Sequence, residues 1–336
     1  MKELITLVRP EQRLEIVDVG AADLEHGQKP PYLPLVQAGA ARVTGFEPNP
    51  DEFAKLPQTE NRRYLPYALG QGGQAQLYIT QTPGFCSTLA PNADVAALIH
   101  GFSAHMALRD SLAVDTQRLD DLDQIEAVDC LKIDIQGGET AVFAGGQAKL
   151  ARCLVVQTEV AFWPFYENQP SFADQDRALQ ALGLQFFAMQ SVNRFPLAGV
   201  PQRLRRQSRR RDAGPWVDGD ALYVRQIAQW PGLSTRELQH LLLLLACVTT
   251  ALSAVCYLAD LLQARGALGA AEVRRVQDIV AAGGHGPRRG LAHAAHIFGG
   301  HGHGFDHRIG PAAHLQPHRG HRAAGDPCQQ PAGLGV

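Results

Sequence analysis

Between residues 14 and 225, short runs rich in β-branched residues alternate with longer stretches that have helical spacing. This alternation is typical of a parallel sheet whose strands are joined by crossover helices. It therefore predicts a doubly wound, mostly parallel α/β fold with helices on both faces. We expect strands at 15–20, 42–47, 76–80, 130–135, 153–160, 184–189 and 221–225, and helices at 51–56, 94–108, 139–150 and 172–182.

The length of 336 residues allows one such domain and an extension. We assign residues 1–230 to the main domain and 231–264 to a C-terminal helix packed on it, with Ser234 as its N-cap. Within that helix, residues 241–259 contain no charged side chain and reach the length of a membrane span. Hydroxyl residues in the middle and weak basic anchors favour a buried helix instead.

Residues 265–336 differ from the rest of the chain in composition. No Lys, Ser or Thr occurs from residue 258 onward, and His, Gly, Ala and Arg dominate the final segment. We expect a low-complexity tail that is disordered or translated out of its natural frame. A histidine-rich metal-binding tail is the alternative.

Charge and cysteine content exclude several other classes. A net charge of -2 gives no electrostatic case for nucleic acid. The arginine-rich run at 202–212 lacks interleaved aromatics, which favours a solvated loop over a site for an anionic partner. Six scattered cysteines without a C-x-x-C pair indicate neither a disulfide framework nor a zinc site.

Because the N-terminus lacks the apolar run of a signal peptide, we expect a cytoplasmic protein.

Acidic residues follow four of the expected strands. Ligands of doubly wound sheets bind outside the carboxyl ends of the strands, so acids at these positions meet on one rim. They predict a cofactor crevice, and they are Asp18, Glu47, Asp134 and Glu159.

The turn after the first strand discriminates between cofactors. A dinucleotide needs three glycines there to approach its pyrophosphate. This chain has Gly20 followed by Ala22 and Glu25, and a carboxylate at the third position would repel phosphate. S-adenosylmethionine has no phosphate and is cationic, so the turn favours it over NAD. A dehydrogenase using NAD stays an alternative, as does a degenerate domain that binds a partner without catalysis.

Six motifs occur in the order found in FkbM-type methyltransferases. They are VDVGA (17–21), FEPNP (46–50), YLPYALG (64–70), CSTL (86–89), RLDDL (118–122) and LKIDIQGGE (131–139). The chain resembles this family over residues 14–262. The resemblance implies a Rossmann-like class I methyltransferase fold and S-adenosylmethionine as cofactor. It further implies transfer to an oxygen, often of a sugar or glycosylated small molecule.

Carried over by position, the resemblance assigns the cofactor contacts. Asp18, Gly20 and Ala21 would line the amino-acid end of the cofactor, and Glu47 would bind its ribose hydroxyls. The adenine would be bordered by Pro48, Asn49, Ala68 and Leu69.

An alcohol acceptor must lose a proton, which requires a base or a metal. Asp134 is the first candidate base, and Glu159 and Glu139 are the next. Lys132 lies two residues from Asp134 on one strand face and is expected to pair with it, either in a catalytic role or as an ion pair that braces the strand. Clustered carboxylates would alternatively hold Mg²⁺, which we do not favour.

The acceptor is expected to be a small molecule or a glycan rather than nucleic acid. Trp163 and Tyr166 follow Glu159 and are expected to stack on a sugar face, with packing in the core as the alternative. His100 and His105, on the helix expected at 94–108, are treated as ordinary structural histidines. The loops that would determine the acceptor contain no motif with readable chemistry.

Overall fold

The computed structural model describes residues 1–21, 29–204 and 214–282, all within the first of two compact units, Met1–Ile297. Several expectations therefore concern residues outside the described part. These are Ala22 and Glu25 of the first turn, most of the arginine-rich run and most of the histidine-rich tail.

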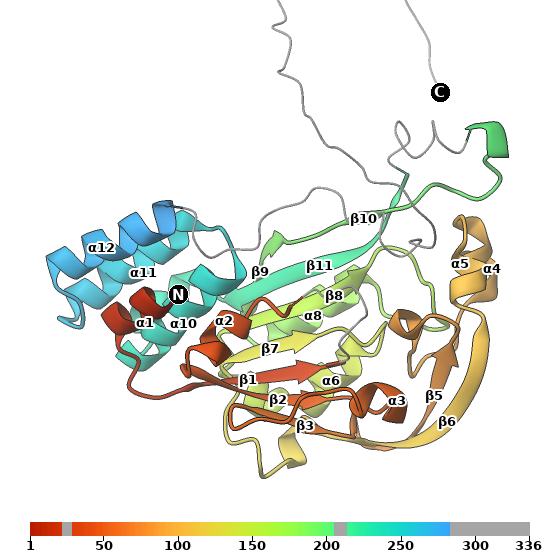
Figure 1. Cartoon of the computed structure of the whole chain (residues 1–336), viewed down its shortest axis with the longest axis horizontal. Helices are drawn as coiled ribbons and strands as arrows, with labels where there is room; N and C mark the ends of the chain where they lie inside the picture. The colour runs from red at the N-terminus through yellow and green to blue at the C-terminus, as the bar shows by residue number, and fades with distance from the viewer. Residues whose placement is uncertain (22–28, 205–213, 283–336) are drawn as a thin grey trace, which may run out of the picture. The chain divides into compact units, whose positions relative to one another are not determined.

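One central sheet contains eight strands in the order β10-β11-β8-β7-β1-β2-β3, with β9 paired to β11 (Figure 1). The five strands from β8 to β3 are parallel, whereas β11 is antiparallel to its neighbours. The expected doubly wound, mostly parallel fold is confirmed. The strands are β1 Leu14–Val19, β2 Ala41–Phe46, β3 Arg62–Leu65, β7 Cys130–Ile133, β8 Val155–Ala161, β9 Leu184–Met189, β10 Asn193–Arg194 and β11 Trp216–Arg225.

Apolar side chains alternate between two cores, one on each face of this sheet. From β1, Leu14 and Ile16 enter a core with α1 (Lys2–Val8), α2 (Leu33–Gln37) and the C-terminal helices. Val17 and Val19 point to the other face, into a core with α6 (Glu139–Gly145) and α8 (Phe172–Ala181). The nearly continuous apolar run of β1 follows from burial on both faces.

A second sheet has three strands in the order β4-β6-β5. They are β4 Ala68–Leu69, β5 Gly73–Thr80 and β6 Leu108–Gln117. The single helix expected at 94–108 is wrong. Two short helices occur instead, α4 (Ala93–Leu98) and α5 (Phe102–His105), because Gly101 between them has a φ of 88° that no α-helix contains.

Other helix expectations differ in extent. The helix expected at 139–150 divides into α6 and α7 (Gln147–Leu150) at Gly146. The expected 51–56 helix is the shorter α3 (Pro50–Phe53), which Asn49 caps. The α8 helix starts at Ser171, whose hydroxyl accepts from the Asp174 amide in a capping box.

The C-terminal region forms three helices. Ser234 caps α10 (Thr235–Val248) as expected, but the helix does not continue to 264. The backbone of Thr249 is extended, and α11 (Leu252–Ala264) follows it. A third helix, α12 (Ala270–Ala281), lies within the segment assigned to the tail, so the boundary at 265 is corrected. Among the described residues, none of the helices combines the length and apolar character that a membrane crossing demands.

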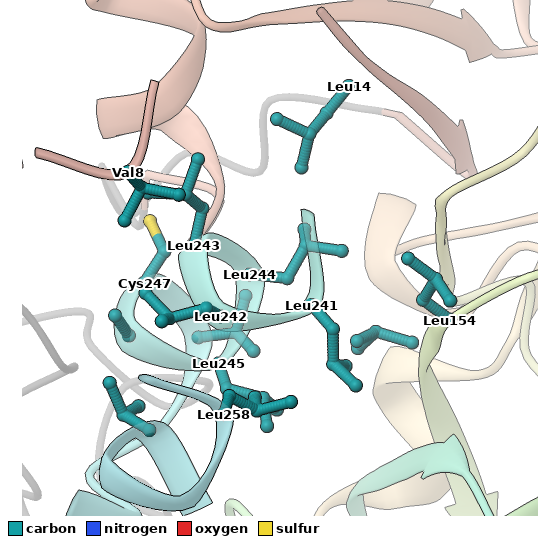
Figure 2. Packing of buried hydrophobic residues seen from close by; sticks show 14 of the residues in the cluster. Val8, Leu14, Leu154, Leu241, Leu242, Leu243, Leu244, Leu245, Cys247 and Leu258 are labelled. Carbon is teal, nitrogen blue, oxygen red and sulfur yellow. The ribbon is translucent and has the colours of Figure 1, made fainter. Parts of the chain in front are cut away.

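The leucine-rich part of α10 is the centre of the first core (Figure 2). Leu241, Leu242, Leu243, Leu244 and Leu245 are all fully buried. They pack with Val8 of α1, Leu14 of β1 and Leu258 of α11. Such complete burial explains why this segment contains no charged side chain.

Leu242→Ala should destabilise the protein by roughly 2–5 kcal/mol, since it removes buried methyl groups and leaves a cavity. Leu252→Ala on the neighbouring helix is the matched control, because Leu252 is 43% exposed, and it should cost less than about 1 kcal/mol. Urea unfolding of both variants measures the difference. Equal losses would contradict the packing described for α10.

Candidate functional site

One face of the central sheet changes from apolar to polar along its strands. Leu14, Cys130, Val155 and Leu222 belong to the core under α10. Further toward the carboxyl ends of the parallel strands, alternate residues on the same face are polar. These are Asp18, Lys132, Asp134, Gln157, Glu159, Asp218 and Asp220, and all except Asp18 are half-buried rather than buried.

Asp18 and Lys132 form an ion pair on this face. Their strands are neighbours in register, and Lys132 Nζ lies 3.1 Å from Asp18 Oδ1. Tyr32 at the start of α2 donates its hydroxyl to the other oxygen of Asp18. Burial alone would lower the pKa of Lys132, but Asp18 and Asp134 raise it well above its usual value. The expected partner Asp134 was therefore wrong, because Lys132 bonds across the strands to Asp18.

The ends of β1, β2 and β7 meet at Gly20. Its φ is 76°, and a Cβ atom there would lie 2.0 Å from the carbonyl oxygen of Asp134. The amides of Gly20 and Ala21 both donate to the carbonyl of Phe46, at 3.0 and 3.1 Å. Only glycine fits this close approach.

Glu47 follows β2 and is 6% exposed. Its Oε1 accepts from the amide of Asn49 at 2.9 Å, and Asn49 Oδ1 in turn accepts from the amide of Asp51. Asn49 also lines a cavity of about 220 Å³ that reaches Thr80 and Cys86.

The other expected adenine contacts lie in different places. Pro48 is half-buried, whereas Ala68 and Leu69 are buried in β4 and are not among the residues that line this cavity.

The loop after β7 is held by Glu139, which is 1% exposed. Glu139 Oε1 accepts from the amides of Ile135 at 3.1 Å and Gly137 at 3.2 Å. Burial raises the pKa of Glu139 to about 7, although these backbone bonds oppose the shift. Glu139 thus faces the backbone of its own loop, which does not fit its expected place as a candidate base.

Gln136 connects the two remaining candidate bases. Its Nε2 lies 2.9 Å from Asp134 Oδ1 and 2.8 Å from Glu159 Oε2. Sequence reasoning did not select Gln136, although a polar residue directly between the strand-end acid and the glycine pair was a usable signal.

Glu159 also adjoins acids on β11 that sequence reasoning missed. It is paired in register with Asp220, and Asp218 lies two residues further along the same face. Burial and then the charges of Asp134 and Asp218 raise the pKa of Glu159 well above its usual value. Burial raises the pKa of Asp218 to about 6 despite a hydrogen bond from Asn193. The alternation in WVDGDALY would have placed Asp218 and Asp220 together.

Tyr166 does not present an open ring to an acceptor. It is 2% exposed, and its hydroxyl lies 3.0 Å from the carbonyl of Phe85 and 3.1 Å from Gln136 Oε1. Its expected stacking role does not fit this burial, whereas Trp163 is half-buried. His105 bonds through Nδ1 to the hydroxyl of Thr82 at 2.8 Å.

Metal binding finds no geometric support in the part of the chain that the structure describes. Within residues 1–21, 29–204 and 214–282, no group of three or more His, Cys, Asp or Glu residues is arranged to hold a metal ion. The amide of Gln136 lies between Asp134 and Glu159, where the alternative interpretation placed Mg²⁺.

A doubly wound sheet with a glycine turn after its first strand and acids at the strand ends is typical of a Rossmann-like cofactor-binding fold. The family profile described as "Methyltransferase FkbM domain" matches residues 18–186. The chain belongs to this FkbM methyltransferase family. No curated protein sequence matches the chain.

The solved structures that match the chain include other methyltransferases. The FkbM methyltransferase of Methylobacillus flagellatus KT is 13% identical with a TM-score of 0.34, and the match covers 63% of this chain and 43% of that one. The magnesium protoporphyrin IX methyltransferase of Synechocystis PCC 6803, solved with S-adenosylmethionine, is 11% identical with a TM-score of 0.31, covering 67% and 77%. A TehB-like methyltransferase of Corynebacterium glutamicum is 13% identical with a TM-score of 0.29, covering 67% and 86%.

Gly20→Ala should cost at least about 3 kcal/mol in unfolding free energy, because it combines a positive φ with a clash against backbone. Gly39→Ala separates the two effects. Its φ of 74° is nearly the same, but nothing lies within 4 Å of the added atom, so a cost of about 1–2 kcal/mol is expected. Equal costs in chemical denaturation would contradict the close approach to Asp134.

Glu139 should give the protein a pH-dependent stability. Because its folded pKa of about 7 exceeds the ordinary glutamate value of 4.5, the folded state retains a proton that the unfolded state loses. The free energy of unfolding of the wild type should therefore fall by up to about 3 kcal/mol relative to that of Glu139→Gln as pH rises from 4.5 to 7. Urea unfolding across this range measures it. Exposed Glu60→Gln is the control, and a pH-independent difference between wild type and Glu139→Gln would contradict the assignment.

Proposed function

We propose that this protein is an S-adenosylmethionine-dependent methyltransferase that methylates a hydroxyl oxygen of a sugar, a glycan or a glycosylated small molecule. The observation that supports it most is the position of Asp134. The backbone of Asp134 touches the Gly20 turn, and its carboxylate is joined through Gln136 to Glu159. A candidate base thus adjoins a turn suited to a cofactor without phosphate.

The residues at the turn fit such a cofactor. Gly20 lets the turn pass close to the backbone of Asp134, and Glu47 places a buried carboxylate at the end of the next strand. Gly20 and Ala21, with Asp18 beneath them, would border the amino-acid end, and Glu47 would bind the ribose. Pro48, Asn49, Ala68 and Leu69 would border the adenine, with Asn49 reaching it from the adjoining cavity.

When bound, S-adenosylmethionine would supply an electrophilic methyl group for in-line displacement. The contribution of the protein is to orient the acceptor and to accept its proton. Burial and neighbouring acids raise the pKa of Glu159 well above its usual value, which favours its protonated form. We assign Asp134 as the base, and Lys132 supports it as the cation between Asp18 and Asp134.

A polyhydroxylated acceptor suits the acids at this rim. Asp134, Glu159, Asp218 and Asp220 are half-buried and offer oxygens that accept hydrogen bonds from hydroxyl groups. Trp163, also half-buried, would add an apolar surface for a sugar ring. Among the described residues of the rim, Lys132 is the one lysine, and Asp18 already pairs with it. A phosphorylated acceptor is therefore less suited.

Isothermal titration calorimetry with S-adenosylhomocysteine and with NAD⁺ tests the cofactor. We expect the wild type to bind S-adenosylhomocysteine and not NAD⁺. Glu47→Ala should weaken this binding at least about tenfold, since it removes a partner of the ribose hydroxyls. Glu60→Ala is the matched control, because the Glu60 side chain is 83% exposed.

Binding of NAD⁺ alone would indicate the dehydrogenase alternative, and binding of neither would indicate a degenerate domain. Asp134→Asn serves as the second control. It should bind S-adenosylhomocysteine like the wild type but lose transfer of labelled methyl groups to a panel of glycosides. Full transfer by this variant would contradict the assignment of Asp134 as the base.

A further inference from the structure

The side chain of Gln136 uses both ends of its amide. Its Nε2 lies within 2.9 Å of Asp134 Oδ1 and 2.8 Å of Glu159 Oε2, so one N–H group faces each carboxylate. Its Oε1 lies 3.1 Å from the hydroxyl of Tyr166. One amide thereby joins the end of β7, the end of β8 and the buried Tyr166.

These contacts specify which way the amide points. A carboxylate only accepts hydrogen bonds, so Asp134, the proposed base, must face the NH₂ end of the amide, and Glu159 Oε2 lies beside the same nitrogen. The oxygen end then requires a donor, and the single hydroxyl proton of Tyr166 is shared between this oxygen at 3.1 Å and the carbonyl of Phe85 at 3.0 Å. Because Tyr166 is 2% exposed, water does not replace this contact freely.

The backbone around Gln136 is held in an unfavourable conformation. Its φ is 59°, in the left-handed region that favours glycine or asparagine. The hydroxyl of Ser87 donates to the Gln136 carbonyl at 2.7 Å, and Glu139 bonds the amides on either side, those of Ile135 and Gly137. A shorter residue would suit this backbone better, so the long amide serves its side-chain contacts.

We propose that Gln136 is a positioning residue that holds Asp134 and Glu159 as a fixed pair, with Tyr166 locking the orientation of its amide. A role of Gln136 in catalysis rests on the proposed function, in which the two carboxylates would face the acceptor hydroxyl. The effect of Gln136 on the two carboxylates themselves can be measured without an acceptor.

Several other charged or titratable groups surround this pair and affect its protonation. They are Asp18 on β1, Lys132 on β7, Glu139 on α6, Tyr166 after β8, and Asp218 and Asp220 on β11. A variant must therefore change the Gln136 amide without adding charge. Gln136→Met retains the length and removes both N–H donors.

Carboxyl ¹³C NMR titration of the protein labelled at Asp and Glu tests the proposal, with Asp134→Asn and Glu159→Gln used to identify the signals. Loss of the N–H donors should disfavour the ionised form of each carboxyl group, Asp134 and Glu159. In Gln136→Met their titration midpoints should rise by about one unit, a tenfold change in the proton dissociation constant. Gln74→Met, the same change on exposed β5, should leave the midpoints unchanged.

Gln136→Asn separates positioning from a structural role. Asparagine suits the left-handed backbone, so the thermal unfolding temperature of the variant should equal or exceed that of the wild type. Its amide is one methylene shorter and cannot span both carboxylates, so the midpoints should rise as in Gln136→Met. Wild-type midpoints in this folded variant would overturn the proposal. Failure of the wild type to bind S-adenosylhomocysteine would instead overturn the proposed function. The two outcomes are distinguishable because the titration does not depend on cofactor binding.

Discussion

The packing of α10 on one face of the central sheet determines where a polar site can form. Its buried leucines cover the first halves of β1, β7 and β8, where the sheet presents Leu14, Cys130 and Val155. A charged side chain that pointed into these leucines would be buried without water or a partner. On this face, the polar residues of the three strands therefore lie in their second halves. The carboxyl-end rim is thus the part of this face on which carboxylates are half-buried and can meet a ligand.

Among the described residues of that rim, carboxylates outnumber cations. The excess negative charge is stabilised in two ways. Lys132 neutralises Asp18 in an ion pair that Tyr32 completes. Asp134 and Glu159 instead share the neutral amide of Gln136. A neutral donor stabilises the ionised form less than a cation does, so burial and mutual repulsion still raise the pKa of Glu159. A carboxyl group that retains its proton beside one that accepts hydrogen bonds suits proton transfer, whereas two complete ion pairs would not.

Sequence patterns predicted those features that depend on local chemistry. The strand at 184–189 has the expected bounds, and Ser234 caps α10 because its capping box lies within four residues. The expected helix at 94–108 failed because apolar content alone does not reveal the break at Gly101. The tail boundary failed because composition concealed the spacing of Val273, Val276 and Ile279, which α12 buries.

In the candidate site, too, the features that depend on nearby residues could be predicted, whereas those that depend on distant parts of the chain could not. The rim acids could be placed from strand ends, because parallel strands bring their carboxyl ends to one edge. Their partners could not, because two groups on one strand and two groups on adjacent strands are equally compatible with the sequence. Lys132 thus bonds across to Asp18 rather than along its own strand to Asp134. Gln136 was overlooked for a related reason. Its importance comes from Glu159 and Tyr166, which are 23 and 30 residues away in the chain and reach it only after β8 has paired with β7.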